Sequence, residues 1–565
     1  MRKYMFGVLA CVLCVSVLFG CAKSGEQITK INLSDEKITV DGAEISEDGT
    51  KAVYAANDII YYEEGKDFTY GEGTEKDAHS KSEADAHTVV HITKPGTYEL
   101  SGTISKGQIA VDLGKESVED PEAVVTLILN NLDITCTVAP AVIFYNVYEC
   151  FGDATEENAV KDVDTSAAGA NVIIADDSVN TVNGSYVARI YKPDSVELSE
   201  DGKTVKDAKK LHKYDAAFYS KRTMNINGGK KGNGKLDIYA ENEGLDSELH
   251  LTLNGGNVKI VSGNDGINTN EDNISVTTIN GGTLNIVVNG STGEGDGIDS
   301  NGWLVINGGT VISQACGFSM DGGIDSDRGI HINGGTVIAS GNMLDRISQS
   351  DQTYVVLNFS KFLGKGKYTL KNSDNKAVIE CEIENSFTTL VLSNENLTEG
   401  DYTLWYEDNQ LCGFATENSM GGGFGGKMFE GGFPEGMEMP EGFDPGKMRP
   451  GMENMPPQDF NGQWEMPEMP GVENTTPPEF NGDIGKMPPN FNEEQRKFAG
   501  KEDATMAMPE GMGERPDKFE GKGGGERVPG SKNAGNTPNQ AVELSEVFNI
   551  KTGANYFSFV SVKEN

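Results

Sequence analysis

From residue 89 to about residue 340 the chain alternates short β-branched runs with turn-forming residues. Examples are VVHIT, QIAVDL and VVTLILNNLDITC, which Pro, Gly, Asn and Asp separate from one another. Runs of about four to eight residues with this composition and punctuation predict β-strands. The region shows no periodicity of about 3.6 residues, which an amphipathic helix would require. We therefore predict an all-β fold.

A tetrapeptide recurs five times in this region, and a second motif keeps step with it. The tetrapeptide is Ile or Leu followed by Asn-Gly-Gly, and it begins at residues 226, 253, 279, 306 and 332, in steps of 27, 26, 27 and 26. In four repeats a triplet such as Ile298-Asp299-Ser300 begins eight residues earlier. The fifth, Ile267-Asn268-Thr269, begins twelve residues earlier, which indicates a four-residue insertion.

A repeat of about 26 residues made of strands and Asn-Gly-Gly turns fits one coil of a parallel β-helix. Each coil would stack about 4.8 Å above the last, with apolar positions pointing inward and the Asn-Gly-Gly forming a stacked turn. Glycine supplies the positive φ that such corners need. We predict a right-handed parallel β-helix over residues 89–340.

Residues 341–418 change to an aromatic-rich alternation, as in TYVVLNF and DYTLWY, which predicts a small antiparallel β domain at the end of the solenoid. Residues 419–541 are dominated by Gly, Pro, Met and Glu, and contain 13 of the 18 methionines. This composition cannot pack a core, so we expect a disordered insertion. Residues 542–565 alternate again and are expected to return to the small β domain.

The N-terminal segment has the features of a bacterial lipoprotein signal. Residues 1–20 carry Arg2 and Lys3, then a short apolar run, and end just before Cys21, the predicted lipidation site. Residues 21–88 are predicted to be a polar tether and an N-terminal cap. We expect an exported protein that is held to the outer face of the bacterial membrane by its lipid. Of the remaining cysteines, Cys381 and Cys412 are a plausible disulfide pair.

Net charge narrows the classes of partner. The chain carries 47 basic and 87 acidic side chains, a formal net charge of -40. Nucleic acid would be repelled by this surface, which excludes a nucleic-acid-binding protein of the ordinary electrostatic kind. The same excess of acid suits calcium binding.

The corners before the Asn-Gly-Gly turns carry acidic or amide side chains in several repeats. In adjacent coils these side chains would lie about 4.8 Å apart, and Ca²⁺ takes six to eight oxygen ligands from carboxylates and carbonyls in flexible loops. The alternative is that they cap turns through side-chain to backbone hydrogen bonds. The candidate calcium ligands are Glu243, Asp246, Asp265, Asn268, Asp296, Asp299, Asp321 and Asp325.

Signals for an enzyme are weak. The six histidines are scattered, without paired metal-ligand spacing. A calcium-dependent lyase would need a basic residue beside the acidic edge, and Lys221, Lys235 and Lys259 are the candidates. For binding to a neutral glucan, the nearest aromatic candidates are Trp303, Tyr239 and Phe318. Because the signals for an enzyme are weak, we expect no catalytic residue.

The order of the segments GTYELSGTI, QIAVD, VTLILNNLDITC, APAVIF, NTVNGS and DAAFYSK, followed by the INGG and GIDS-type corners, resembles a clostridial family of cell-surface carbohydrate-binding β-helix proteins. The resemblance implies a fold similar to that of calcium-dependent pectate lyases, bound calcium, and affinity for cellulose-like or polygalacturonate-like polymers, without established catalysis. It carries the acidic corner residues over as calcium ligands. Tyr219 replaces Asp or Asn in its corner, and Asp321 is one residue out of register with Asp296.

The sequence therefore predicts a non-catalytic, calcium-binding surface lipoprotein that binds polysaccharide. The first alternative is a calcium-dependent polysaccharide lyase. The second is a structural or adhesion protein whose Met-rich segment is the binding element. The sequence leaves the identity of the glycan and the oligomeric state open.

Overall fold

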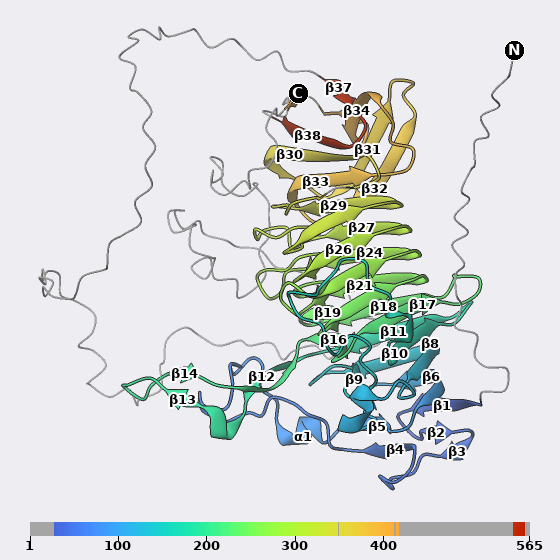
Figure 1. Ribbon diagram of the computed structural model, residues 1–565, viewed down its shortest axis with the longest axis vertical. Coiled ribbons are helices and arrows are strands. Elements are labelled where there is room, and N and C mark those ends of the chain that lie inside the picture. The colour runs from blue at the N-terminus through green and yellow to red at the C-terminus, as the bar shows by residue number, and fades with distance from the viewer. Residues whose placement is uncertain (1–26, 349, 412–413, 417–545, 560–565) are drawn as a thin grey trace, which may run out of the picture. The chain divides into compact units, whose positions relative to one another are not determined.

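Apart from a hairpin insertion at residues 187–214, successive strands between residues 88 and 341 join three parallel ladders in turn (Figure 1). The computed structural model describes residues 27–348, 350–411, 414–416 and 546–559. Partner residues in neighbouring strands of the ladder that contains the Ile or Leu of each Asn-Gly-Gly motif are 26 or 27 apart in the later repeats, as in Thr252 with Thr278 and Thr278 with Val305. In another ladder the four-residue insertion changes the spacing, to 22 between Leu245 and Ile267 and 31 between Ile267 and Ile298. The predicted all-β class is confirmed, and in the former ladder the repeat period is the period of strand pairing.

Ladders one and two share two long strands, β6 and β8, and then separate. Ladder one comprises β6 (Gly96–Ile104), β8 (Val125–Cys136), β10 (Ala170–Ile174), β17 (Met224–Gly228), β20 (His250–Leu253), β23 (Val276–Ile279), β26 (Trp303–Ile306) and β28 (Gly329–Ile332). Ladder two continues from β8 through β11 (Val179–Gly184), β18 (Lys235–Ala240), β21 (Asn257–Ser262), β24 (Thr283–Val288), β27 (Thr310–Gln314) and β29 (Thr336–Gly341).

Ladder three is a separate eight-stranded sheet. It comprises β4 (Val53–Ala56), which is antiparallel to its neighbour, and then the parallel strands β5 (Thr88–Ile92), β7 (Gly107–Val111), β9 (Val142–Phe144), β16 (Ala216–Ser220), β19 (Glu243–Ser247), β22 (Ile267–Thr269) and β25 (Ile298–Ser300). The described helices are short: α1 (Lys81–Ala84) and the 3₁₀ turns η1 (Lys115–Glu119), η2 (Thr165–Ala167) and η3 (Pro193–Ser195).

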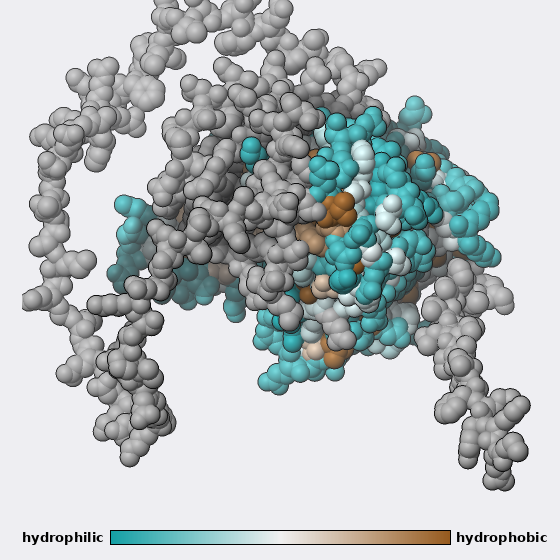
Figure 2. Space-filling view, turned by 90° about the horizontal axis from the view of Figure 1, so that it is seen from above, coloured by the Kyte–Doolittle hydropathy of each residue, from teal (hydrophilic) through white to brown (hydrophobic). Residues whose placement is uncertain are grey.

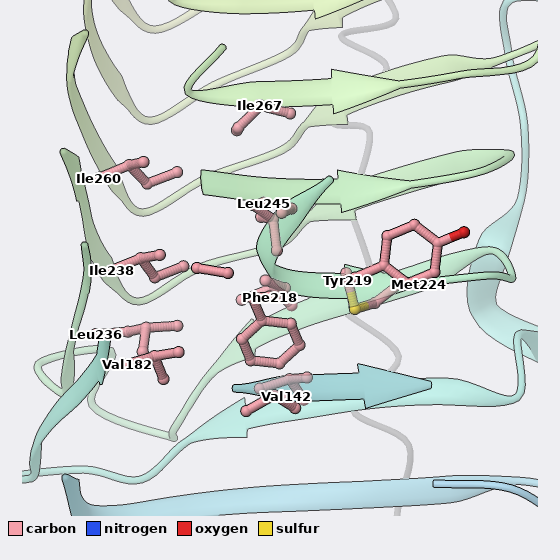
Figure 3. Close-up of a cluster of buried hydrophobic side chains, with 14 of the residues drawn as sticks. Val142, Val182, Phe218, Tyr219, Met224, Leu236, Ile238, Leu245, Ile260 and Ile267 are labelled. Carbon is pink, nitrogen blue, oxygen red and sulfur yellow. The ribbon is translucent and has the colours of Figure 1, made fainter. Parts of the chain in front are cut away.

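The apolar core lies between the ladders. Alternate side chains of ladder two, such as Ile238 and Ile260, point toward Phe218, Leu245 and Ile267 of ladder three (Figure 3). All five are fully buried. Because one repeat places equivalent apolar residues at the same register, each new strand extends a continuous core instead of starting a new one.

The Asn-Gly-Gly segments connect ladder one to ladder two and form a stacked turn. Four side-chain amides each donate to the asparagine of the preceding repeat over 2.9 or 3.0 Å. We call this column the asparagine ladder; its members are Asn227, Asn254, Asn280, Asn307 and Asn333. The second glycine has a positive φ in four of the five turns, and a Cβ on Gly282 would lie 2.5 Å from the carbonyl oxygen of Gly256. Glycine is thus required there for both conformation and space.

The segment before the repeats, where a polar tether and an N-terminal cap were predicted, is folded from residue 27 onward. From residue 27 onward, β1 (Ile28–Ser34) pairs in parallel with β6 and buries Ile31 and Leu33. Two short strands, β2 (Thr39–Val40) and β3 (Ala43–Glu44), pair beside it. The alternating sequence ITKINLS is short but has one apolar face, and the open edge of β6 gives that face a place to pack. Residues 1–26, which include Cys21, lie outside the described residues.

Along the chain, a hairpin arm that the sequence analysis did not predict is inserted between β11 and β16, and it extends to one side of the ladders (Figure 1). Its base is β12 (Val187–Tyr191) paired with β15 (Lys210–Tyr214), and its tip is β13 (Glu197–Leu198) paired with β14 (Val205–Asp207). The arm returns to ladder three directly before β16, so it places Lys213 and Asp215 at the edge of that ladder.

The C-terminal strands cover the end of ladder two. β29 pairs antiparallel with β33 (Phe387–Ser393), which pairs with β30 (Tyr354–Leu363) and through it with β38 (Ala554–Phe559) and β36 (Phe414–Thr416). A five-stranded sheet lies beside them. It contains β31 (Gly366–Asn372), β32 (Ala377–Ile383), β34 (Gly400–Tyr406), β35 (Asn409–Gln410) and β37 (Phe548–Ile550).

Several sequence predictions fall on residues outside the described part, including the expected disordered insertion at 419–541. Cys381 is a buried free thiol, and Cys412 is not among the described residues. The helices of the described part are all too short or too polar to cross a membrane. Seen from above, the described surface that grey atoms leave visible is mainly hydrophilic, with small hydrophobic patches (Figure 2).

Candidate functional site

The acidic corner residues lie in two adjacent columns of ladder three. In the first column Asp246 of β19 pairs with Asn268 of β22, which pairs with Asp299 of β25. Asp325 continues the column, because its backbone N–H donates to the carbonyl of Ile298. The repeat therefore brings these four residues into register, as the sequence predicts.

The second column lies three residues earlier in each repeat. Asp265 accepts a 2.7 Å hydrogen bond from the backbone N–H of Asp296, and Asp296 accepts one of 2.6 Å from Gly322. Glu243 lies one repeat before Asp265 and is linked to the first column, because Asn268 Nδ2 donates to Glu243 Oε1 over 3.2 Å. We call the two columns together the acid line; its members are Glu243, Asp246, Asp265, Asn268, Asp296, Asp299 and Asp325.

The remaining predicted ligand, Asp321, lies one residue out of register with Asp296. One of its carboxylate oxygens accepts from the backbone N–H of Gly295 over 2.6 Å and also from the hydroxyl of Ser319. Asp265 and Asp296 also each accept from a backbone N–H of a neighbouring repeat. Asp321 thus makes the same kind of inter-repeat contact, and in addition it accepts from a nearby hydroxyl.

Tyr219 occupies the first-column position one repeat before Asp246. Its ring is buried, and its hydroxyl donates to Glu248 Oε1. Before it the column continues with Ile143, Ala110 and His91. The first column therefore changes from apolar or aromatic to acidic at Asp246.

Three oxygen atoms of the acid line are buried without a hydrogen-bond donor among the described residues. They are Glu243 Oε2, Asp246 Oδ2 and Asn268 Oδ1, and their residues are 5%, 0% and 7% exposed. A buried polar atom without a partner costs about 1–3 kcal/mol, and more when it is charged. Oxygens from adjacent strands without donors are the chemistry that a hard cation satisfies.

Burial and mutual repulsion disfavour the ionised form of the carboxyl groups in the acid line. Loss of solvation raises the pKa of Glu243 to about 8, and nearby Asp215 adds to the shift. The same cause raises the pKa of Asp325 to about 8, with a hydrogen bond to Asp345 contributing. Burial first, and neighbouring carboxylates second, also raise the pKa values of Asp246, Asp265 and Asp296 well above their usual range.

The hairpin arm brings one ammonium group to the acid line. Lys213 Nζ lies 3.1 Å from Asp215 Oδ2 and donates to Asn270 Oδ1 over 3.4 Å. Burial opposes the charge on Lys213, but the carboxylates of Asp215, Glu243 and Asp246 together raise its pKa above the usual value. Sequence reasoning missed Lys213 because nothing in the repeat indicates where a hairpin insertion returns.

The lysines proposed from the sequence lie elsewhere. Lys235 and Lys259 are on β18 and β21 of ladder two, so they do not face the acid line of ladder three. Lys221 follows β16 directly and is exposed. The predicted arrangement is therefore wrong for Lys235 and Lys259, because the sequence pattern cannot tell which ladder a charged position joins.

The three aromatic candidates do not form one row. Phe318 is buried at 6% exposure and packs in the apolar core, so its ring is not presented to a ligand. Tyr239 is half-buried on ladder two, and Trp303 is half-buried on ladder one. The guanidinium carbon of Arg328 lies 4.0 Å from the centre of the Trp303 ring and covers one of its faces.

The donor set restricts how the acid line can hold a metal. Within the described residues, no three His, Cys, Asp or Glu side chains converge on one point. One ion would therefore draw on no more than two of these carboxylates, and on Asn268, carbonyl groups and water for its other oxygens. Calcium accepts such a mixed and irregular set, whereas Mg²⁺ demands near-octahedral geometry.

The described chain is therefore an all-β repeat protein with parallel ladders and a largely buried line of acidic side chains. The family model for "Carbohydrate-binding domain-containing protein" matches residues 86–381, which is more than half of the 565 residues. The chain belongs to this family of carbohydrate-binding domain-containing proteins.

The chain is similar to two described proteins. A carbohydrate-binding domain-containing protein of Acetivibrio thermocellus is 30% identical over 172 residues, which are 30% of this chain and 44% of that relative. The match thus spans less than half the length of that relative. A solved structure described as a polysaccharide lyase-like protein from C. thermocellum, a gadolinium derivative, matches 55% of this chain and 89% of its own at 20% identity and a TM-score of 0.31.

Proposed function

We propose that this chain is a non-catalytic polysaccharide-binding protein whose acid line holds calcium. Membership of the carbohydrate-binding domain family supports a polysaccharide ligand. The single observation that favours calcium is the set of three buried, donor-free oxygens on Glu243, Asp246 and Asn268. A bound Ca²⁺ would give these oxygens a partner and neutralise the neighbouring carboxylates. It would also bridge an acidic protein to an acidic sugar chain.

We further propose that the three ladders wind as a right-handed parallel β-helix. Connections between parallel strands are right-handed in about 98% of cases, because a right-twisted strand packs back onto its sheet only in that sense. In this fold the acid line runs along one outer edge, where a long sugar chain can contact several repeats at once.

The chain is also proposed to be an exported lipoprotein anchored through Cys21. The signal-like residues 1–20 and the position of Cys21 support this proposal. Expression in a bacterial host with a radiolabelled fatty acid tests it. Label should enter the unmodified chain and be absent from Cys21→Ser; equal labelling of both would refute the anchor.

A calcium-dependent polysaccharide lyase is the second candidate, and Lys213 is the observation that favours it. A basic side chain beside the acid line is the feature that β-elimination from a uronate requires. The raised pKa of Lys213 argues against it, because a lysine that keeps its proton at neutral pH is a poor general base.

One experiment separates these functions. Residues 22–565 are applied to immobilised polygalacturonate and to cellulose, with calcium and with chelator, while absorbance near 235 nm is followed for unsaturated products. Retention that requires calcium, without new absorbance, is the expected result. Rising absorbance would identify a lyase. Absence of retention on either polymer would contradict the binding function and favour an adhesion role for the Met-rich segment, which deletion of residues 419–541 would test.

A further inference from the structure

Exposed basic residues are rare in the strongly acidic second half of the repeat stack, and Arg328 is one of them. Between residues 260 and 345 the sequence contains a single Lys or Arg, which is Arg328. The same stretch carries ten acidic side chains: Asp265, Glu271, Asp272, Glu294, Asp296, Asp299, Asp321, Asp325, Asp327 and Asp345. An anionic ligand approaching this half would therefore be attracted only near its few cations, which include Arg328, Arg346 beside β28, and Lys213 of the hairpin arm.

Arg328 lies at the end of the acid line. Its backbone N–H donates to the carbonyl of Gly302 over 2.8 Å, and the next residue, Gly329, pairs with Trp303 in ladder one. Asp325 is three residues earlier, and three residues span at most about 11 Å when fully extended. One short oligosaccharide can thus contact both Arg328 and the acid line.

The guanidinium is held in place without being neutralised. Its carbon lies 4.0 Å from the centre of the Trp303 ring, and Nη1 donates to the carbonyl of Asn273 over 2.8 Å. Among the described residues Arg328 forms no ion pair with a carboxylate, whereas Arg189 pairs with Glu72 at 2.7 Å. The indole and the carbonyl orient the side chain, and its remaining N–H groups and its charge are left for a ligand.

We propose that Arg328, positioned by Trp303, binds the carboxylate of a uronate residue, so that the glycan bound at this edge is an acidic polysaccharide. A planar guanidinium recognises a carboxylate through two parallel hydrogen bonds. A neutral glucan would gain nothing from this group. The proposal rests on the proposed polysaccharide-binding function and names its ligand class.

The test compares Arg328→Gln, Arg328→Lys and the unmodified protein for binding to polygalacturonate in saturating calcium, by isothermal titration calorimetry. The matched control is Lys371→Gln, because Lys371 also stacks on a tryptophan, Trp405, at 3.9 Å but lies in the C-terminal sheet. Loss of a charge-assisted, bidentate contact is expected to weaken binding by Arg328→Gln about tenfold or more. Arg328→Lys should be intermediate, and Lys371→Gln should be unchanged.

Calcium binding without glycan is measured for the same variants, and it should be unaltered in Arg328→Gln. Equal polygalacturonate affinity for Arg328→Gln and the unmodified protein would overturn the subsite and leave the proposed function intact. Failure of the unmodified protein to bind both polygalacturonate and cellulose would overturn the subsite and the proposed function together. Tighter binding to cellulose than to polygalacturonate by the unmodified protein would overturn the acidic-ligand assignment alone.

Discussion

The repeat stacks two sets of polar side chains, the asparagine ladder and the acid line, at different turns. They differ in whether their side chains can hydrogen-bond to one another. In the asparagine ladder each amide donates to the one before it, and the column lies at the surface. In the acid line the carboxylates lie at a similar spacing and are largely buried. Glu243 Oε2 and Asp246 Oδ2 have no hydrogen-bond donor within the part of the chain that the structure describes. An amide has both a donor and an acceptor, so copies of it satisfy one another, whereas ionised carboxylates only accept.

The difference separates structure from function. In the asparagine ladder the side chains satisfy one another's hydrogen bonds, so this column needs no ligand and stabilises its turn. A column that cannot satisfy itself costs stability until another group supplies positive charge, which is why buried unpaired acids are candidates for binding sites. The following predictions test this contrast, from the largest expected effect to the smallest.

The largest effect is expected from calcium itself. A ligand that binds only the folded state stabilises it by about 2.7 kcal/mol at a free concentration a hundredfold above Kd. Differential scanning calorimetry in chelator and in millimolar calcium should therefore show a clearly higher unfolding temperature with calcium. Magnesium is the control and should act more weakly, because it requires a rigid octahedral site. An unfolding temperature insensitive to calcium would contradict the calcium proposal.

The effect of Asp246→Asn on stability should change sign with calcium. In chelator at neutral pH the variant removes one buried, repelled carboxylate and is expected to be more stable than the unmodified protein by about 1 kcal/mol. In calcium it should be less stable, because it loses a ligand. Thermal unfolding in the two buffers measures both differences. Asp272→Asn, an exposed acid outside the acid line, is the control and should stay within about 0.5 kcal/mol in both.

In chelator the stability should fall as the pH rises from about 6.5 to 8. The pKa values of Glu243 and Asp325 are raised from 4.5 and 3.8 to about 8, so the folded state binds more protons than the unfolded state in this range. Their stabilising contribution is complete below about pH 4 and is lost toward pH 8. Buried His250 acts oppositely, but its pKa is lowered from 6.5 to about 4, so it matters below pH 6.5.

Unfolding temperatures at pH 6.5, 7.25 and 8 measure this effect. Saturating calcium should flatten the dependence, because the bound ion keeps the carboxylates ionised in the folded state. A stability in chelator that stays constant or rises over this range would show that the acid line is already neutralised by protein groups.

The smallest effect is expected in the asparagine ladder. Asn280→Ala removes the hydrogen bond to Asn254 Oδ1 and the one accepted from Asn307, each 2.9 Å long. At a net value of about 0.5–1.5 kcal/mol per hydrogen bond, and with water able to replace it at this exposed corner, a loss of about 1 kcal/mol is expected. The loss should be the same with calcium and with chelator. A loss that appears only in calcium would couple the two columns.

Much of the fold and part of the site follow from the sequence. The step of 26 or 27 residues predicts which strands pair, and the triplets at Asp246, Asn268 and Asp299 predict a column that the structure contains. Asp321, which the sequence shows to be one residue out of register with Asp296, accepts a backbone N–H from the neighbouring repeat, and its role as a ligand stays a prediction. Phe318 was offered as a surface ring because composition does not show that the core extends to it.

The repeat pattern does not predict which side chains are buried or which residues contact them. Lys213 reaches the acid line through a hairpin arm, and Arg328 meets the Trp303 ring from the next repeat. The segment after residue 27 reads as polar, yet β1 finds an unpaired edge on β6 and folds. Each of these contacts joins residues whose local sequence carries no shared pattern.

The sequence by itself determined the all-β class, the period and the register of the polar columns, because a fixed repeat gives every copy the same backbone path. The tertiary structure decided which column is buried without donors, which cations lie beside it, and which strands close the ends. These properties depend on what distant segments bring to a surface, and desolvation has no signature in local sequence. If its carboxylates were exposed to water, the same Asp-Gly-Ile-Asp segment would be an ordinary turn.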